Sequence, residues 1–292
     1  MLFSYLVEMG GVSVVVPAYN EEDCIEDCIL RLLGQGECVR EIIVVDNNSA
    51  DKTAEIVRRL VAADPRVVLI AESRQGAAFA RSTGFDQARC DIIARVDADS
   101  VVGPGWAGAL AGFLEGDVGA EFDLVSTPVE FRMPGRRFQA ALNRWDDPFN
   151  KYRDRPQSID YALGCSMAMR RSAWLRIRSL VNMRRDIFDD IDMALCVIDT
   201  GGSCALLRSV VVEVSGRRFY NGVARYAAYA AWMPRTYRLH RRWRKSALLY
   251  AGLPVSIAFH AARLVYLRRV GAAGDFALRD PLDRAEAERV RP

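Results

Sequence analysis

Four short apolar runs, each followed by a helical pattern, constrain the fold of this chain most strongly. The runs are rich in β-branched residues and occupy residues 12–16, 41–45, 67–70 and 92–96. A short uninterrupted apolar run is typical of a strand buried on both faces of a parallel sheet. Strands that alternate with helical segments form right-handed βαβ units. The sequence therefore predicts an α/β fold with a mostly parallel, doubly wound sheet.

The composition narrows the class of protein. The chain has 292 residues, of which 51% are hydrophobic and 26% are charged, and its net charge is +3. These values indicate an ordered globular protein, not a disordered chain or a polytopic membrane protein. No recognition-helix or RNA-binding motif is present, so we expect no nucleic-acid partner. The seven scattered cysteines are typical of reduced thiols, and the opening residues lack the features of a secretory signal, so we expect a cytoplasmic protein.

Polar side chains follow three of the four runs. Tyr19 comes after the first, Asp46 directly after the second and Asp97 directly after the fourth. In doubly wound sheets, ligands bind beyond the carboxyl ends of the strands. We therefore expect these side chains, which are distant in sequence, to line one pocket.

The fourth run leads into two aspartates, Asp97 and Asp99. Residues i and i+2 of a strand lie on the same side, so both carboxylates are expected to converge on one ligand. Such close charges repel each other unless a cation lies between them, and Mg²⁺ or Mn²⁺ prefers carboxylate oxygens. The alternative is a solvated turn, where aspartate is common.

The second half of the chain is less regular. We expect strands over residues 124–131 and 205–214, and a partly helical excursion over residues 136–157. After Ser215 the composition changes, which predicts a first domain over residues 1–215 and a helical extension over residues 216–292.

The extension contains a candidate membrane segment. Basic residues gather at 241–245, and residues 246–262 contain no Asp, Glu, Lys or Arg. This stretch is short against the roughly 20 residues that a spanning helix requires, whereas its basic and aromatic flanks suit a helix lying in the membrane interface. We expect peripheral membrane contact through residues 241–267. A helix that packs on the domain and a spanning helix remain alternatives.

Three segments occur in a characteristic order: Val-Ser-Val-Val-Val-Pro-Ala-Tyr-Asn-Glu-Glu at 12–22, Val-Val-Asp-Asn-Asn-Ser-Ala-Asp at 44–51 and Arg-Val-Asp-Ala-Asp at 95–99. Over roughly residues 11–215, this order resembles the pattern of glycosyltransferase family 2. The resemblance implies an inverting glycosyltransferase of the A-type fold. Such an enzyme uses a nucleotide diphosphate sugar as donor and a divalent metal, Mn²⁺ or Mg²⁺.

The resemblance implies roles for residues in the first two segments. Pro17, Tyr19 and Glu21 would line the nucleoside pocket, and Asp46 would accept a hydrogen bond from the base. An aromatic ring offers a stacking face, and a carboxylate suits the N–H edge of a base. The alternatives are a rim aromatic for Tyr19 and a turn cap for Asp46.

Three further roles concern the sugar and the diphosphate. By the family pattern, Arg81 would approach the donor, Asp97 would contact the ribose or sugar, and Asp99 would hold the metal. A metal is needed because a diphosphate leaves poorly while its charge is uncompensated. For Arg81, a salt bridge to a neighbouring acid is the alternative.

A third acidic segment supplies candidates for the general base. Phe-Asp-Asp-Ile-Asp-Met at 188–193 resembles the family's Glu-Asp-x-Asp-Leu segment, with Asp190 at the position of the base and Asp189 in place of glutamate. The choice between Asp189 and Asp190 stays open. The alternative is an acidic helix start that the helix dipole stabilises.

Other functions fit the sequence less well. A dinucleotide dehydrogenase needs Gly-x-Gly-x-x-Gly after its first strand, and this chain has Pro-Ala-Tyr-Asn-Glu there. A phosphatase that uses Asp-x-Asp would leave the segment after Phe188 unexplained. The remaining alternative is a catalytically inactive sugar-nucleotide-binding or membrane scaffold protein of the same fold. We predict transfer of a sugar to a saccharide or lipid-linked acceptor hydroxyl, at the cytoplasmic face of the cell membrane.

Overall fold

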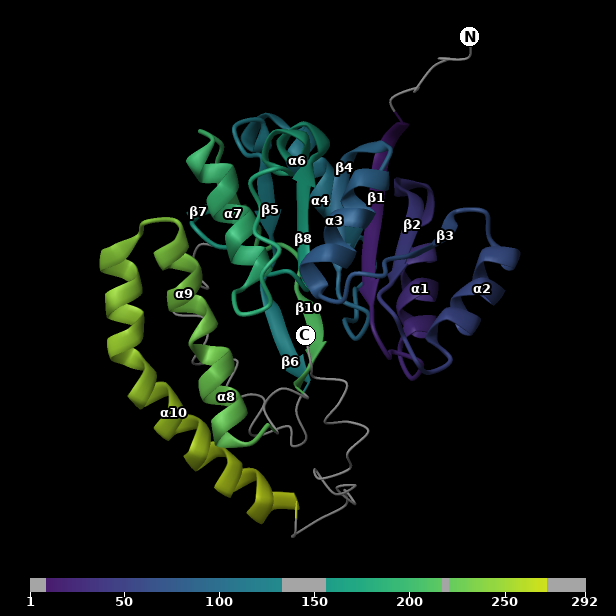
Figure 1. Cartoon of the computed structure of the whole chain (residues 1–292). Coiled ribbons are helices and arrows are strands. Elements are labelled where there is room, and N and C mark those ends of the chain that lie inside the picture. Colours follow the sequence, from purple (N-terminus) through teal and green to yellow (C-terminus); the bar gives the residue numbers. More distant parts are fainter. Residues whose placement is uncertain (1–8, 133–155, 217–220, 272–292) are drawn as a thin grey trace. The chain divides into compact units, whose positions relative to one another are not determined.

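The computed structural model describes residues 9–132, 156–216 and 221–271 (Figure 1). Their contacts divide the chain into two compact units. The α/β unit comprises Met1–Met183 and Asp189–Val214, and the helical unit comprises Arg184–Phe188 and Ser215–Pro292. One short segment from the middle of the chain therefore belongs to the helical unit. The predicted excursion over residues 136–157 lies almost entirely outside the described residues.

The α/β unit is built on a mixed sheet. Within the described residues it has eight strands in the order β3-β2-β1-β4-β8-β5-β9-β7. The first four pair in parallel, β8 is antiparallel to both of its neighbours, β5 pairs in parallel with β9, and β7 is antiparallel to β9. The strands are β1 (Met9–Ala18), β2 (Val39–Asp46), β3 (Val67–Ala71), β4 (Cys90–Val96), β5 (Leu124–Ser126), β7 (Gln157–Ile159), β8 (Ser166–Arg170) and β9 (Cys204–Leu206). This confirms the α/β class and the four predicted N-terminal strands.

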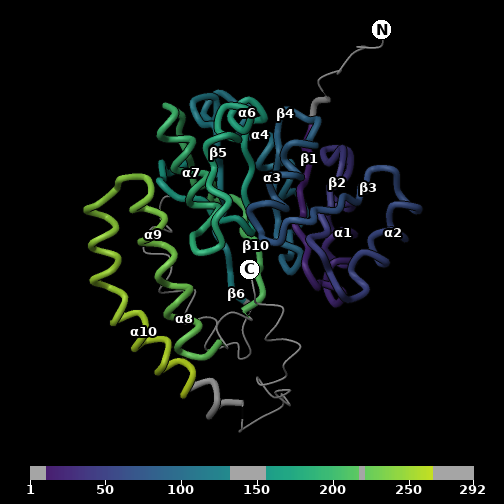
Figure 2. Tube along the Cα trace, viewed as in Figure 1, coloured from purple at the N-terminus to yellow at the C-terminus, as the bar shows by residue number. Residues whose placement is uncertain are grey.

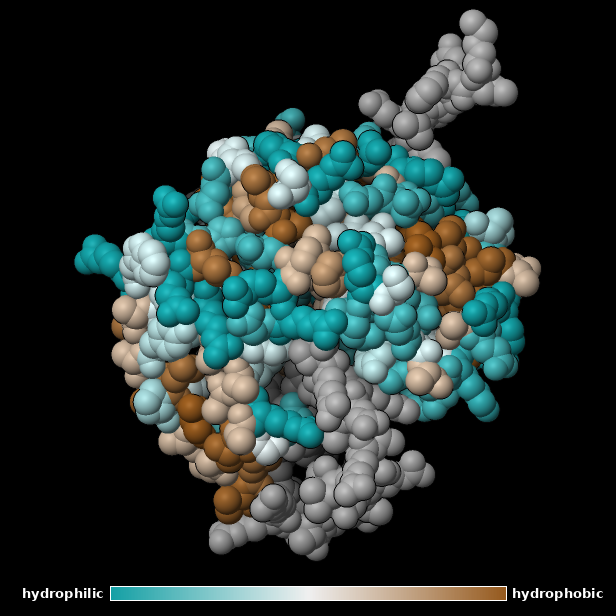
Figure 3. Space-filling model, in the orientation of Figure 1, coloured by the Kyte–Doolittle hydropathy of each residue, from teal (hydrophilic) through white to brown (hydrophobic). Residues whose placement is uncertain are grey.

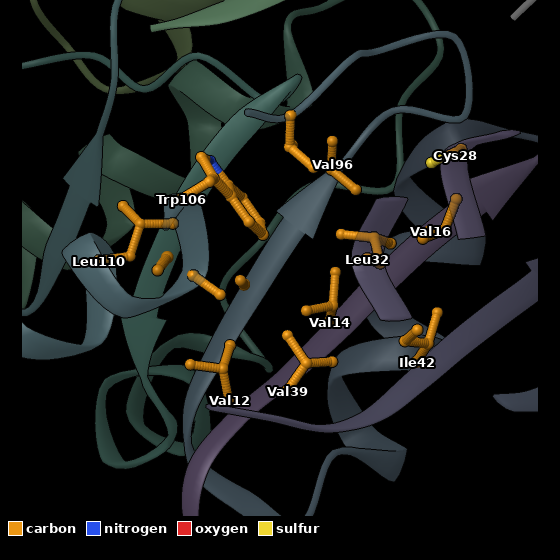
Figure 4. Packing of buried hydrophobic residues seen from close by; sticks show 14 of the residues in the cluster. Val12, Val14, Val16, Cys28, Leu32, Val39, Ile42, Val96, Trp106 and Leu110 are labelled. Atoms are coloured by element: carbon orange, nitrogen blue, oxygen red, sulfur yellow. The ribbon is translucent and has the colours of Figure 1, made fainter. Parts of the chain in front are cut away.

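Helices cover both faces of the sheet, which explains why its central strands are mostly apolar. On one face, Val12, Val14 and Val16 of β1 share a core with α1, α2 and α4 (Figure 4). On the other, Val15 packs in a core with α3, α6 and α7. The helices are α1 (Ile25–Leu33), α2 (Thr53–Ala63), α3 (Ala77–Gln87), α4 (Trp106–Glu115), α6 (Arg171–Ile177) and α7 (Asp189–Asp199), with 3₁₀ turns η1 (Gly36–Cys38) and η2 (Asp117–Gly119). All four valines are fully buried, as a parallel strand requires.

Two predicted strands are each divided in the structure. The stretch 124–131 forms β5 in the main sheet and β6 (Val129–Arg132) in a second, and the stretch 205–214 forms β9 and β10 (Val212–Ser215) in the same way. Strands β6 and β10 pair with each other. The first break falls at Pro128, which has no backbone N–H to donate to a ladder. Its carbonyl instead accepts a hydrogen bond from the N–H of Val212.

The helical unit contains α8 (Val223–Ala230), α9 (Trp232–Leu239) and the long helix α10 (Trp243–Gly271). Figure 2 shows α8 and α9 following each other along α10, and both contact it. Polar side chains of α10 face this contact: Ser246 donates to the carbonyl of Pro234 at 2.8 Å, Ser256 bonds Tyr226 at 2.7 Å, and the ring of His260 stacks on that of Tyr226 at 3.9 Å. The interior of this unit is thus unusually polar.

The outward face of α10 is apolar. Leu248 and Val255 are each 73% exposed, and Phe259 and Val265 are each 52% exposed. Residues 247–262 contain no Asp, Glu, Lys or Arg. Hydrophobic surface gathers over α10 at the lower left of Figure 3. Among the described residues, Trp243–Val265 is one helix that is long and apolar enough to cross a membrane. This polarity is the reverse of that of a helix on the surface of a water-soluble domain.

Candidate functional site

The site begins where the strand order reverses. After β3, the chain returns past β1 and adds β4 on its other side, so the carboxyl ends of β1 and β4 are neighbours. Ligands of doubly wound sheets bind outside such a reversal, because the two loops there diverge. Tyr19 follows β1 and Asp97 follows β4 directly. Both side chains are partly exposed.

Asn20 ties the loop after β1 to the loop after β2. Its backbone N–H donates to Oγ of Ser49 at 3.0 Å, and its side-chain Oδ1 accepts from the N–H of Ala50 at 2.8 Å. Asn20 has a positive φ of 54°, a conformation that asparagine tolerates better than most residues. Asn20 lies outside the first helix, which begins at Ile25. Asn20 stabilises the two loops instead.

The backbone at Glu21 belongs to the same junction. Its N–H donates to Oγ1 of Thr53 at 2.8 Å, and its side-chain Oε2 accepts from the thiol of Cys24 at 3.0 Å. Asp46 ends β2 beside Ala18 of β1. One carboxylate oxygen of Asp46 accepts from the N–H of Ser49 at 3.3 Å. The turn-cap alternative for Asp46 is therefore present, and its contact with a base remains a prediction.

Asn47 is a residue of this edge that the sequence interpretation does not single out. It is buried, its Nδ2 donates to the carbonyls of Glu72 and Arg74 at 2.8 Å, and its Oδ1 accepts from the N–H of Gly76 at 2.7 Å. Asn47 thus holds the segment from β3 to α3 against the end of β2. An asparagine directly after a strand was the available signal.

Asp97 and Asp99 lie on the turn after β4, and both are partly exposed. The thiol of Cys28 in α1 lies 3.9 Å from the carbonyl oxygen of Asp97. Burial raises the pKa of this thiol far above its ordinary value, and the carboxylates of Asp99 and Asp97 raise it further. The sulfur therefore stays a neutral thiol, and the charged donors are carboxylate oxygens. Such a donor set fits a hard divalent cation that takes its remaining ligands from water and phosphate.

A buried arginine joins Asp97 to the third acidic segment. Arg95 of β4 is 6% exposed, and its Nη2 contacts Oδ1 of Asp97 at 3.0 Å. Its Nη1 contacts Oδ2 of Asp189, at the start of α7, at 2.8 Å. The sequence interpretation assigns no role to Arg95. A charged residue within an otherwise apolar, buried strand was the signal, because such a residue requires a partner.

Arg81 of α3 contacts the same carboxylate. Its Nη1 lies 2.8 Å from both Oδ2 and the carbonyl oxygen of Asp189, and its side chain is completely buried. The salt-bridge alternative for Arg81 is thus present in the structure, and a contact with the donor remains a prediction. Burial would raise the pKa of Asp189, yet Arg95 and Arg81 hold that pKa below its ordinary value. Asp189 is therefore ionised.

Asp190 has a different environment from its neighbour. Its Oδ2 accepts from the N–H of Gly164 at 2.8 Å, and its Oδ1 accepts from the N–H of Ile191 at 2.8 Å. Burial, followed by the charge of Asp189, raises the pKa of Asp190 to about 6. A carboxyl with this pKa accepts a proton readily near neutral pH, as a general base must.

Gly164 serves two of these groups at once. A Cβ at this position would lie 2.7 Å from Nη1 of Arg95, which is too close for any side chain. The same residue donates its N–H to Asp190. Glycine therefore lets the backbone reach Asp190 without displacing the guanidinium of Arg95 from its ion pairs.

The structure thus brings together Asp97, Arg95, Asp189 and Arg81 through direct ion pairs, with Gly164 linking Asp190 to the same cluster. Tyr19 and Glu21 lie on the loop after β1, and Asp46 is the last residue of the neighbouring strand β2.

Residues 13–177 match the family model described as "Glycosyl transferase family 2". The match covers more than half of the chain, which therefore belongs to this family. Glycosyltransferase AglE of Haloferax volcanii is 36% identical over 138 residues, covering 46% of this chain and 44% of that protein. Poly-beta-1,6-N-acetyl-D-glucosamine synthase of Staphylococcus aureus is 30% identical over 95 residues, covering 32% and 23% respectively. The matched region thus spans less than half the length of either protein.

Solved structures agree in fold. The mannosyltransferase PcManGT of Pyrobaculum calidifontis, in complex with GDP-Man and Mn²⁺, has a TM-score of 0.59 and 20% identity, covering 95% of this chain and 77% of that one. S. aureus TarS in complex with UDP-GlcNAc has a TM-score of 0.57 and 15% identity, covering 77% and 66%. These similarities confirm the predicted A-type fold.

Proposed function

We propose that this protein transfers a sugar from a nucleotide diphosphate sugar to an acceptor hydroxyl with inversion, and that Asp190 is the general base. The observation that carries the proposal is the contrast between two adjacent carboxyls. Asp189 is ionised and held by two buried arginines, whereas Asp190 has a pKa of about 6. A single free aspartate would be a weaker base at neutral pH, because its ordinary pKa is lower.

On the donor side, the nucleoside would lie against the loops after β1 and β2. Tyr19 would offer its ring to the base, Pro17 and Glu21 would line the pocket, and Asp46 would accept from an N–H of the base. Asp97 would contact the ribose or the sugar. The bound GDP-Man and UDP-GlcNAc of the two structural neighbours support a donor of this class.

Asp99, with Asp97 beside it, would hold a divalent metal ion. When bound, Mn²⁺ or Mg²⁺ would supply positive charge against the diphosphate leaving group. The Mn²⁺ of the mannosyltransferase structure supports such an ion in this fold.

The transfer itself requires one proton to move. The acceptor oxygen forms a bond to the anomeric carbon as the bond from that carbon to the diphosphate oxygen breaks. Asp190 takes the hydroxyl proton of the acceptor as the new bond forms. Attack from the face opposite the leaving group inverts the anomeric centre, and the electron pair of the broken bond leaves with the diphosphate.

The composition of α10 supports a lipid-linked acceptor. The apolar outward stripe of α10 is preceded by four basic residues, Arg241, Arg242, Arg244 and Lys245. Basic residues next to an apolar helix face suit the anionic surface of a membrane. We therefore propose that α10 lies in the membrane interface at the cytoplasmic face, where a lipid-linked acceptor would be available.

Isothermal titration calorimetry with GDP and UDP, each with Mn²⁺, tests the donor and metal parts. We expect one nucleotide to bind, and its affinity to fall by about tenfold or more in Asp99→Asn or with EDTA. Asp91→Asn is the matched control. Asp91 is exposed near the start of β4, whereas Asp99 follows the end of that strand, so this variant should bind the nucleotide normally.

Failure of both nucleotides to bind in the presence of Mn²⁺ would contradict the transferase mechanism. Binding without turnover of any donor in a panel of UDP-sugars and GDP-mannose would instead indicate an inactive sugar-nucleotide-binding protein.

A further inference from the structure

The segment Arg184–Phe188 lies between two parts of the α/β unit in sequence, yet its contacts assign it to the helical unit. The next residue is Asp189, and the one after it is Asp190. The backbone that carries both carboxyls into α7 therefore emerges directly from a segment packed on α8 and α9.

Phe188 is held there by a directed hydrogen bond. Its backbone N–H donates to Oγ1 of Thr236 at 3.0 Å, and Thr236 is completely buried in α9. The hydroxyl of Thr236 donates its only proton to the carbonyl of Trp232 at 2.8 Å. Its oxygen is thus oriented to accept from Phe188, so the bond has one defined geometry.

The ring of Phe188 adds an aromatic contact to this bond. It packs edge-on against Tyr229 of α8, with ring centroids 4.8 Å apart, and against Trp232 of α9 at 5.9 Å. The rings of Tyr229 and Trp232 are 5.3 Å apart, so the three form one cluster. Such pairs stabilise a fixed orientation beyond the burial of their area.

An ionic contact fixes the other end of the segment. Arg184 contacts both carboxylate oxygens of Asp186 at 2.8 Å, and Arg235 of α9 lies 3.7 Å from Oδ2 of Asp186. The hydrogen bond, the ring contacts and the ion pair thus hold the segment Arg184–Phe188 against α8 and α9. The first two act on Phe188, the residue that precedes α7.

We infer that Thr236 and Phe188 are positioning residues for the general base. By restraining the backbone at Phe188, they set the direction in which α7 begins and hence where Asp189 and Asp190 project. This inference rests on the proposed role of Asp190. It adds that the contacts of Phe188 act on the base through the peptide link at 188–189.

The test measures the base itself, in the full-length protein. We expect the ¹³C signal of the Asp190 carboxyl, assigned by its loss in Asp190→Asn, to titrate near pH 6 in the unaltered protein. In Thr236→Val, which keeps the shape and removes the acceptor oxygen, the pKa of Asp190 should fall as the loosened backbone lets water reach the carboxyl. Turnover should fall by about tenfold or more with nucleotide affinity unchanged, since a small displacement of a base is costly.

Thr236→Ser restores the hydroxyl and should recover both the pKa and the turnover. Ser246→Ala is the matched control, because it removes a buried hydroxyl bond to Pro234 in the same unit without touching Phe188. Equal titration of Asp190 in Thr236→Val and the unaltered protein would overturn the inference, as would an equal loss of turnover in Ser246→Ala. The titration needs no substrate, so its outcome is separate from failure of the protein to bind or transfer any donor.

Discussion

Asp189 and Asp190 show how two identical neighbours acquire different chemistry. Two guanidinium groups contact a single oxygen of Asp189, whereas the carboxylate of Asp190 accepts from the backbone N–H groups of Gly164 and Ile191. The negative charge of Asp189 opposes ionisation of Asp190, which widens the difference between the pKa values of the two carboxyls. The arginines hold Asp189 ionised and its charge raises the pKa of Asp190, whereas the charge of Arg95 lowers that pKa.

The pH dependence of transfer follows from this arrangement. Asp190 must be deprotonated to accept the acceptor's proton, and its pKa in the folded protein is about 6. We expect kcat to rise as pH increases from 5 to 7, with an apparent pKa near 6, and then to level off. Asp190→Asn should abolish transfer and leave nucleotide affinity nearly unchanged. Full activity of Asp190→Asn, with loss of activity in Asp189→Asn, would move the role of base to Asp189.

Arg95 is expected to be important for stability as well. Arg95→Met removes a buried cation and leaves Asp97 and Asp189 without that partner, which should lower the free energy of unfolding by about 3 kcal/mol. Arg40→Met is the matched control, because the ion pair of Arg40 with Glu37 is exposed and should contribute less than about 1 kcal/mol. Urea denaturation of both variants measures the difference. Equal effects would show that burial of the Arg95 pairs does not matter.

At the scale of residues, the sequence predicts where the site residues lie in the fold better than it predicts which side chains they contact. Asp46, Asp97 and Asp99 could be identified because each lies at or just beyond a strand end. The ion pairs of Asp189 could not be identified, because Arg81 and Arg95 are separated from it by 108 and 94 residues. No local pattern specifies a contact over such a distance.

Among the elements, α3 packs unusually close to the sheet. A Cβ added at Gly84 would lie 2.3 Å from Cγ1 of Val15 in β1. Gly84→Ala should therefore lower the free energy of unfolding by about 1–3 kcal/mol. Gly112→Ala in α4 is the matched control, because nothing lies within 4 Å of its added Cβ, and it should raise stability by about 0.5–1 kcal/mol. Thermal unfolding should show opposite signs, and equal signs would contradict the close packing.

The exposed apolar face of α10 predicts that the protein binds to membranes. Val255→Glu combined with Phe259→Glu places charge on the exposed apolar stripe, so flotation with vesicles of phosphatidylglycerol and phosphatidylethanolamine should largely be lost. Val118→Glu combined with Leu180→Glu alters exposed apolar residues of the α/β unit and should leave flotation unchanged. Equal flotation of both double variants would argue against contact through α10.

For the elements, the regular N-terminal half was predictable because each strand reads as an apolar run, and β1, β2 and β4 are largely buried on both faces. The division of residues 124–131 and 205–214 into two strands each was not predictable. The second part of each stretch, β6 or β10, leaves the main sheet, and these two strands pair with each other. Hydropathy alone does not report a change of partner. The apolar stretch in α10 was visible, whereas the inward orientation of Ser246, Ser256 and His260 required the structure.

For the molecule as a whole, the sheet is assembled from segments that are far apart in the chain. In the pairing of β1 with β4, Val12 lies opposite Ile92. One edge of β1 therefore has no partner until the chain has been made through β4. That edge is a run of valines, which pairs readily with other chains while it is exposed.

The consequence concerns how the protein is made. Because β1 is completed late, its refolding from denaturant competes with aggregation, and this competition grows with protein concentration. The central position of β1 in the sheet thus means that this strand gains its second partner only after β4 has been made.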